Sequence, residues 1–196
     1  DLTDRIAIER QLKYHATHDS LTELHNRSTL VSDLNQTISA VKEGESFFVL
    51  FLDLDSFKSI NDNLGHDVGD AVLRNVAKIL NENCAPTDHI ARLGGDEFVI
   101  VKKNCDQRAV TEFCDNLIIA INNKQDRMLE SKIPSSKVSI GIAQYPQNGD
   151  NPTDLLRNSD LAMYSAKKNG GNQHKFYTAH HANLAKELFE KEIEIG

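Results

Sequence analysis

The sequence Gly-Gly-Asp-Glu at positions 94–97 is the clearest candidate for chemistry in this chain. The apolar runs on either side, residues 90–93 and 98–101, are typical of short strands. A Gly-Gly dipeptide lets a hairpin turn adopt positive φ without steric cost, so it can join two such strands. The hairpin would place the carboxylates of Asp96 and Glu97 at or beside its tip, where they can meet solvent, a metal ion or a substrate.

A second acidic site follows the strongest strand pattern of the chain. Residues 47–54 are aromatic and apolar on both faces, as expected for a buried central strand. Asp53 and Asp55, at its carboxyl end, are two residues apart and would share one face. Asp55 has a plainer interpretation as the N-cap of a helix that begins near Ser56. Asp53 lies at the edge where open α/β sheets bind ligands.

The two acidic sites converge if the hairpin lies beside the strand. Carboxylates such as Asp53 and Asp96 repel one another at short range unless a cation lies between them, and carboxylate oxygens suit Mg²⁺. The helix that begins at residues 56–58 would offer free backbone N–H groups to an anion. A metal ion beside a helix N-terminus is an arrangement suited to a triphosphate.

Residues 61–70, rich in Asn, Asp and Gly, have two interpretations. In the first, they form a turn and Asp70 caps and opens the next helix. In the second, they recognise a base, because one carboxylate can accept both the N1–H and the N2–H of guanine. Adenine presents an acceptor at N1, so an ionised Asp70 would reject it.

Composition narrows the class of protein. A chain of 196 residues with 39% hydrophobic and 26% charged residues fits one globular domain with flanking elements. A net charge of -7 argues against non-specific nucleic-acid binding. The longest apolar run, residues 47–52, is far too short to span a membrane, and we find no signal-peptide pattern. Three cysteines without a Cys-x-x-Cys motif predict free thiols in a reducing cytosol, and hence a cytoplasmic domain.

Helix and strand patterns alternate along the chain, which predicts an α/β or α+β domain with a mixed sheet. Besides the hairpin, the strand patterns cover residues 47–54, 137–143 and 175–177. Helical patterns cover residues 1–17, 26–41, 56–64, 70–80, 107–123, 152–168 and 180–194.

Five segments, taken together and in order, resemble the GGDEF domain of the diguanylate cyclase family. They are residues 19–27, 53–70, 94–98, 138–143 and 160–167. The resemblance covers residues 18–178 and implies the palm-like fold of nucleotidyl cyclases, with a roughly five-stranded sheet surrounded by helices. It also implies the condensation of two GTP molecules into cyclic di-GMP, with release of two pyrophosphates. Each GTP attacks the α-phosphate of the other, so the family works as a homodimer.

The resemblance assigns roles to individual residues. A divalent cation, Mg²⁺ or Mn²⁺, would be held by oxygen atoms of Asp53, Leu54, Asp96 and Glu97. The Leu54 ligand would be its carbonyl, and Glu97 would be either a further ligand or an aid to deprotonation. The guanine base of GTP would be contacted by Asn61 and Asp70. Its phosphates would be contacted by Ser56, Phe57, Lys58 and Lys167.

Two positions depart from the family pattern. Gly171 stands where the family commonly has an arginine that touches phosphate, and one such charge-assisted hydrogen bond contributes about 1.5–3 kcal/mol. Ala85 replaces the arginine of an inhibitory product site of which Asp88 remains, so we expect no strong product feedback there. An intact Asp70 favours guanine over a hybrid product. The rival to an active cyclase is a regulatory GTP-binding module that controls a fused EAL phosphodiesterase domain.

The flanking segments suggest a larger parent protein. Residues 1–5 resemble the close of a PAS sensor domain, and residues 1–17 would form a linker helix. Residues 179–196 would form a helix leading to an EAL domain.

Three further residue groups receive weaker interpretations. Asp19 and Arg27 are expected to form a structural ion pair. Arg92 either contacts a carboxylate of the site or simply flanks the hairpin. The pair His180-His181 is assigned to a solvated helix face.

Overall fold

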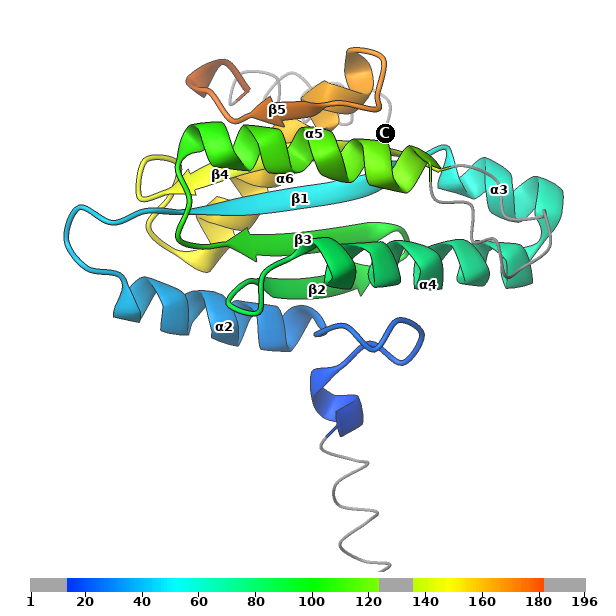
Figure 1. The fold of residues 1–196 in the computed structure, drawn as a ribbon, viewed down its shortest axis with the longest axis horizontal. Coiled ribbons are helices and arrows are strands. Elements are labelled where there is room, and N and C mark those ends of the chain that lie inside the picture. Colours follow the sequence, from blue (N-terminus) through cyan, green and yellow to red (C-terminus); the bar gives the residue numbers. More distant parts are fainter. Residues whose placement is uncertain (1–13, 124–135, 182–196) are drawn as a thin grey trace, which may run out of the picture.

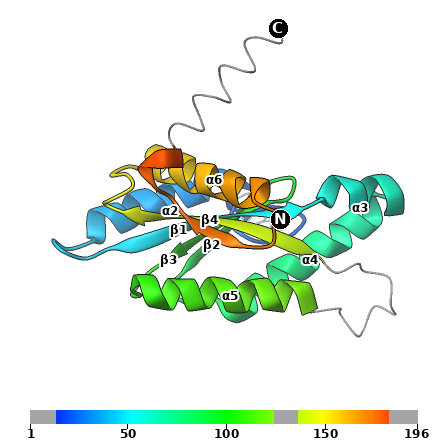
Figure 2. The same ribbon diagram turned by 90° about the horizontal axis from the view of Figure 1, so that it is seen from above.

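The computed structural model describes residues 14–123 and 136–181 of the chain. Its centre is a sheet of five strands in the order β2-β3-β1-β4-β5, with helices on both faces (Figures 1 and 2). The strands are β1 (Phe47–Asp55), β2 (His89–Gly94), β3 (Glu97–Lys102), β4 (Lys137–Tyr145) and β5 (His174–Phe176). The helices around it are α2 (Arg27–Ala40), α3 (Phe57–Leu64), α4 (His66–Asn83), α5 (Gln107–Asn123) and α6 (Pro152–Lys168). Only β4 and β5 pair in parallel among these strands, so the sheet is mixed and the predicted fold class is confirmed.

The central strand β1 divides the core in two. Its even-numbered side chains at positions 48–54 pack with α3, α4 and α5, and its odd-numbered side chains at positions 47–51 pack with α2 and α6. Figure 2 shows α2 and α6 on one side of the sheet and α4 and α5 on the other, with α3 beyond the end of β1. Because side chains alternate along a strand, Asp53 and Asp55 continue the odd-numbered face and point toward the side of α2 and α6.

The positions at which α2 and α6 begin follow directly from the sequence. The side chain of Asn26 caps α2 by accepting a hydrogen bond from the Thr29 backbone N–H, at 3.1 Å. Asn151 caps α6 in the same way, with Pro152 in the first turn. The predicted starts of both helices are confirmed, as is the predicted extent of α5.

Helix α6 lies directly on β4 at Gly141. A Cβ atom at this position would fall 1.9 Å from the Ser159 carbonyl oxygen, so only a residue without a side chain permits the contact. This approach sets the distance between α6 and the sheet. It therefore sets the position of Lys167, near the C-terminal end of the helix.

The helix predicted over residues 56–64 is confirmed, but the interpretation of residues 61–70 as a turn, with Asp70 opening the next helix, is wrong. Helix α3 runs to Leu64 and α4 begins at His66, so the chain reverses at Gly65 alone, whose φ is +89°. Asp70 therefore lies within α4 and does not open it. The Asn and Asp residues that favour a turn are accommodated in helix instead, because one glycine supplies the required positive φ.

Several predictions lie partly or wholly outside the described residues. Of the predicted helix over 1–17, residues 14–17 are described and are helical. Residues 182–194 of the last predicted helix are not described. Within residues 14–123 and 136–181, no helix combines the length and the apolar character needed to cross a membrane.

A buried ion pair joins the two strands of the hairpin at the end away from the glycines. The Asp88 side chain has no exposed surface, and its carboxylate accepts from the Lys102 ammonium at 2.7 Å and from the Ala85 backbone N–H at 2.8 Å. The Lys102 ammonium also lies 4.5 Å from the centre of the Phe113 ring. The Asp88 carboxylate is thus occupied by internal partners.

We expect Asp88→Ala to destabilise the domain by about 3–5 kcal/mol, because it leaves the Lys102 charge buried without a partner. Urea unfolding followed by circular dichroism measures the free energy. The matched control is Arg157→Ala, which breaks the exposed pair between Arg157 and Asp154 and should cost about 0–1 kcal/mol. Equal losses in the two variants would contradict the assignment of Asp88 to the core.

Candidate functional site

The end of β1 and the start of β3 bring acidic side chains together. The antiparallel register pairs Asp53 with Glu97, and Asp96 precedes Glu97 in the hairpin turn. The Asp53 carboxylate forms an ion pair with the Lys167 ammonium, and the Asp96 carboxylate lies close enough to raise the pKa of Asp53. The predicted convergence of Asp53 and Asp96 is present, and Lys167 of α6 faces it.

The ionisation of Asp53 reflects this crowding. Burial raises the pKa of Asp53 to about 7, repulsion from Asp96 adds to the rise, and the Lys167 ammonium opposes it. Two carboxylates with a single ammonium group carry an unbalanced negative charge, which makes Asp53 easier to protonate than an ordinary aspartate. An oxygen-rich site with a missing positive charge fits a hard divalent cation. Leu54 lies beside Asp53 with its side chain in the core, so only its backbone can reach such an ion.

Glu97 is the second acid of the hairpin, and it lies half-buried toward α2 and α6. Burial raises its pKa, Asp160 of α6 raises it further, and Arg27 at the start of α2 opposes the rise. A cavity of about 380 Å³ opens beside Glu97 and is lined in part by Arg27, Leu93 and Asp160. Glu97 therefore has an environment of its own, next to the Asp53 group.

A partly buried arginine fixes the hairpin turn. The Arg92 Nη1 atom donates to both oxygens of Asp19, at 2.9 and 3.0 Å, and its Nε and Nη2 atoms donate to the Gly95 carbonyl oxygen at 3.0 and 2.7 Å. Burial raises the pKa of Asp19, but hydrogen bonds from Thr22 and Arg92 outweigh it and hold the pKa below its usual value. Because Gly95 immediately precedes Asp96, this network holds the turn that presents the carboxylate.

The prediction of an ion pair between Asp19 and Arg27 is therefore wrong. Asp19 pairs with Arg92, which is 73 residues away in the sequence. The short separation of Asp19 and Arg27 favoured a local pair, but the chain returns to Asp19 through β2. Of the two interpretations of Arg92, neither describes it fully: its side chain binds Asp19 and the Gly95 carbonyl oxygen of the hairpin turn.

Asp55 does not cap α3, so that prediction is also wrong. It is the last residue of β1, and its carboxylate accepts from the Ser139 hydroxyl and from the Asn172 backbone N–H, both at 2.7 Å. Ser56 occupies the N-cap position, with φ +61° and no side-chain capping bond. Phe57 is buried and Lys58 is exposed on the first turn of α3.

Gly171 lies against the same Asp55 carboxylate. Its φ is +68°, and a Cβ atom there would fall 2.8 Å from Asp55 Oδ2. A side chain at this position would require both a left-handed backbone and a displaced Asp55. The space next to the Gly171 Cα is thus occupied by an acid of β1.

Asn61 and Asp70 form a second group, on α3 and α4. The Asn61 side chain lies so close to Gly69 that a Cβ atom there would fall 1.9 Å from Asn61 Oδ1. Asp70, the next residue along α4, is half-buried. The structure thus places the Asn61 amide against the turn of α4 that carries Asp70.

The structure thus contains the acidic pair, the lysine beside it and the polar residues on the next two helices that the motifs predict. The family model "Diguanylate cyclase, GGDEF domain" matches residues 16–173. The chain belongs to this family, which confirms the resemblance drawn from its motifs.

Two curated relatives come from Pseudomonas aeruginosa. The chain is 39% identical over 181 residues to the bifunctional diguanylate cyclase/cyclic di-GMP phosphodiesterase MucR, covering 91% of this chain and 26% of MucR. It is 38% identical over 185 residues to the diguanylate cyclase TpbB, covering 93% of this chain and 42% of TpbB. The chain thus spans less than half the length of either relative.

Solved structures agree with this assignment. The GGDEF domain of TpbB superposes with a TM-score of 0.81 at 35% identity, covering 86% of this chain and 99% of that one. The GGDEF domain of DgcB from Caulobacter crescentus, in complex with c-di-GMP, gives a TM-score of 0.74 at 28% identity, covering 82% of this chain and 95% of that one.

The raised pKa of Asp53 predicts that Mg²⁺ binding depends on pH. The cation needs the carboxylate, and Asp53 keeps its proton below about pH 7, so affinity should rise about tenfold per pH unit up to pH 7 and level off above it. Calorimetric titration with MgCl₂ in two buffers of different ionisation enthalpy counts the released protons. We expect close to one proton at pH 6 and close to none at pH 8.

Asp53→Asn is the control for this titration, since it cannot release the proton. Equal Mg²⁺ affinity of the unmodified domain at pH 6 and pH 8 would contradict the expectation. Mg²⁺ is the suitable probe because it prefers oxygen ligands and leaves histidine side chains unoccupied.

Proposed function

We propose that this domain is a diguanylate cyclase, which condenses two GTP molecules into cyclic di-GMP with release of two pyrophosphates, using Mg²⁺ and acting as a homodimer. The observation that carries the proposal is the group formed by Asp53, Asp96 and Lys167 at one end of β1 and β3. Membership of the GGDEF family and the names of MucR and TpbB support it.

Asp53, Asp96, Glu97 and the Leu54 carbonyl would hold the Mg²⁺ ion, which supplies positive charge that polarises a phosphate and screens the departing pyrophosphate. Lys167 balances Asp53 in the free domain. Once the carboxylate has another cationic partner, the Lys167 ammonium is released to bind a phosphate oxygen. The backbone N–H groups of Ser56, Phe57 and Lys58, with the Lys58 side chain, would hold the remaining phosphates.

Glu97 has the properties of a proton acceptor for the attacking 3′-hydroxyl. Its pKa is raised by burial, which brings it toward the range in which a general base works at neutral pH. A second role, as a further ligand of the cation, uses the same oxygens. Asn61 and Asp70 would select guanine, with Asp70 accepting from its Watson–Crick edge.

The reaction requires two copies of the domain. Each domain presents one such acidic group and one polar pair for a base, so it binds one GTP. Ring closure needs two attacks, each by the 3′-hydroxyl of one GTP on the α-phosphate of the other. We therefore propose a catalytic dimer with the two sites face to face.

We further propose that the domain covers residues 18–178, between a linker helix over 1–17 and a helix over 179–196. PAS-like and EAL-like domains would adjoin it in the parent chain. The bifunctional relative MucR supports the second of these neighbours. GTP is a cytoplasmic metabolite, so the domain would act in the cytoplasm.

The decisive experiment is incubation with GTP and MgCl₂ at a concentration that allows dimerisation, with the product identified by mass spectrometry. We expect cyclic di-GMP from the unmodified domain. Asp53→Asn should lower the rate by at least about a hundredfold, since it removes a charge that the transition state requires. Asp115→Asn, which changes an exposed carboxylate paired with His174, is the control and should leave the rate unchanged.

A regulatory GTP-binding module remains the second candidate, and the position of Gly171 favours it. The family arginine is absent there, and Asp55 occupies the space beside the glycine. Tight GTP binding without any cyclic dinucleotide, in a domain forced to dimerise by a fused coiled coil, would establish this alternative and contradict the proposed activity.

The contact between Gly69 and Asn61 yields a test of base recognition. In Gly69→Ala the new methyl group must displace the Asn61 amide, so we expect GTP to bind about tenfold more weakly, the loss of roughly one hydrogen bond. In an Asn61→Ala background the same change should have little further effect. Full additivity of the two substitutions in a double-mutant cycle would contradict the role of Asn61.

A further inference from the structure

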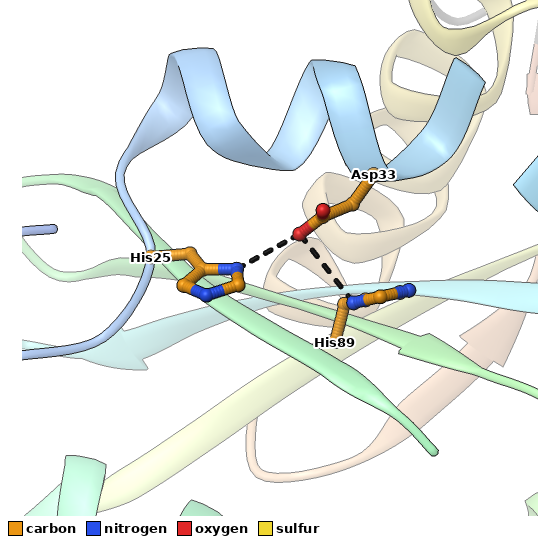
Figure 3. Close-up of side chains that lie close together, drawn as sticks. All are labelled: His25, Asp33 and His89. Atoms are coloured by element: carbon orange, nitrogen blue, oxygen red, sulfur yellow. Dashed lines mark hydrogen bonds and ion pairs between the residues drawn. The ribbon is translucent and has the colours of Figure 1, made fainter. Parts of the chain in front are cut away.

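Two histidines and an aspartate converge outside the acidic site, as Figure 3 shows. The Asp33 Oδ2 atom lies 2.8 Å from His25 Nδ1 and 3.4 Å from His89 Nδ1. The three ligand atoms all lie within 4.8 Å of one another. His25 precedes α2, Asp33 lies on α2 and His89 is the first residue of β2, so three separate segments meet at this point.

The donor set is that of a transition-metal site. Two imidazole nitrogens and one carboxylate oxygen, with a fourth position open to water, match the ligands that Zn²⁺ takes in tetrahedral geometry. Zn–N and Zn–O bonds near 2.0–2.1 Å place neighbouring ligand atoms roughly 3.4 Å apart. The separation between His89 and Asp33 already has this value, and that between His25 and Asp33 has to widen by several tenths of an ångström.

The backbone holds these residues in place without an ion. The His25 N–H donates to the Ile90 carbonyl at 3.3 Å, and the Arg92 N–H donates to the His25 carbonyl at 2.9 Å. The loop before α2 is thus fastened to β2. Ligands on rigid elements need little rearrangement to bind. The side chains of His25, Asp33 and His89 are 34%, 14% and 26% exposed, which leaves an entry path for an ion.

A network of hydrogen bonds alone is the competing explanation, and Lys103 distinguishes the two. The Lys103 ammonium lies 3.0 Å from His89 Nε2, so that nitrogen acts as an acceptor and Nδ1 carries the proton that faces Asp33. When a metal binds at Nδ1, a neutral imidazole moves its proton to Nε2. Two donors would then face each other, and Lys103 would have to turn away. Lys103 therefore opposes metal binding and supports the hydrogen-bonded network.

We propose that His25, Asp33 and His89 form a binding site for a divalent transition-metal ion, with Zn²⁺ as its best match. The bound ion fastens the start of α2 to β2, the strand that leads into the hairpin. The His25 carbonyl accepts from the backbone of Arg92, whose side chain holds the turn at Gly95. A bound ion would thus stabilise the segment to which the backbone of Arg92, and through its side chain the hairpin turn, is attached. The proposal does not depend on the enzymatic activity of the domain.

Zn²⁺ affinity is measured by competition with a chromophoric chelator on metal-free protein with residues 1–196. We expect one ion per chain at this site and a rise in melting temperature with ZnCl₂. His25→Gln, His89→Gln and Asp33→Asn should each weaken this binding at least about tenfold, since even the outer partners of a ligand affect affinity by 10–100-fold. The glutamine and asparagine variants keep polar groups in place, and their melting temperatures without metal show whether they fold.

Two further variants sharpen the test. His174→Gln is the matched control, because His174 pairs with Asp115 at 3.2 Å outside this cluster, and it should bind Zn²⁺ as the unmodified chain does. Lys103→Met removes the competing ammonium and should bind Zn²⁺ several-fold more tightly. A variant that does not fold is replaced by Co²⁺ titration of the unmodified chain and Lys103→Met, in which the visible absorption of tetrahedral cobalt reports imidazole ligation directly.

The outcomes separate cleanly. Loss of one Zn²⁺ equivalent in the three ligand variants, with tighter binding in Lys103→Met, supports the site. Unchanged Zn²⁺ binding in the ligand variants, or weaker binding in Lys103→Met, overturns it in favour of the hydrogen-bonded network. Absence of a tetrahedral cobalt spectrum from the unmodified chain has the same meaning.

Discussion

The antiparallel pairing of β1 with β3 decides where every acidic side chain of the site lies. β1 is buried on both faces, with its even and odd positions committed to two different sets of helices. If the register slipped by one residue, each side chain of β1 would point to the opposite face of the sheet. Asp53 would then point toward α4 and α5. The register is therefore strongly specified by packing far from the site. It places Asp53 opposite Glu97, and the glycines of the turn then leave Asp96 beside both.

Packing also maintains an electrostatic arrangement that is unfavourable on its own. Asp53 and Asp96 repel one another, and burial adds to the cost of their charges. Lys167 offsets part of this cost because α6 is seated on β4 at Gly141 and ends beside Asp53. Arg92, which is paired with Asp19, holds the Gly95 carbonyl in the turn that carries Asp96. Packing of the core thus holds together acidic groups that would otherwise move apart. A positively charged ligand would offset their remaining repulsion.

Sequence reasoning succeeded where the signal is local or periodic. The apolar run of β1, the starts of α2 and α6 and the period of α5 each depend on residues within a few positions, and all were predicted. It failed where a side chain has its partner far along the chain. Asp55 resembles a helix cap next to Ser56, but its partners Ser139 and Asn172 are 84 and 117 residues away. Asp19 lies close in sequence to Arg27 but pairs with the distant Arg92. His25, Asp33 and His89 follow no recognisable spacing in the sequence. They come together because β2 lies beside α2 in the fold.

Asp55 and Gly171 show how one departure from the family pattern is tied to the geometry of the site. The Asp55 carboxylate is engaged by Ser139 and by the backbone of Asn172, so its oxygens are turned toward β4 and the segment after α6. A side chain at position 171 would collide with it. The missing arginine and the orientation of Asp55 are therefore parts of a single arrangement. Since Asp55 is engaged in this way, Asp53 is the β1 carboxylate that faces the acids of the hairpin and Lys167. Since position 171 has no side chain, the cationic contact to phosphate from this end of the sheet would, under the proposed function, fall to Lys167, which pairs with Asp53 in the free domain.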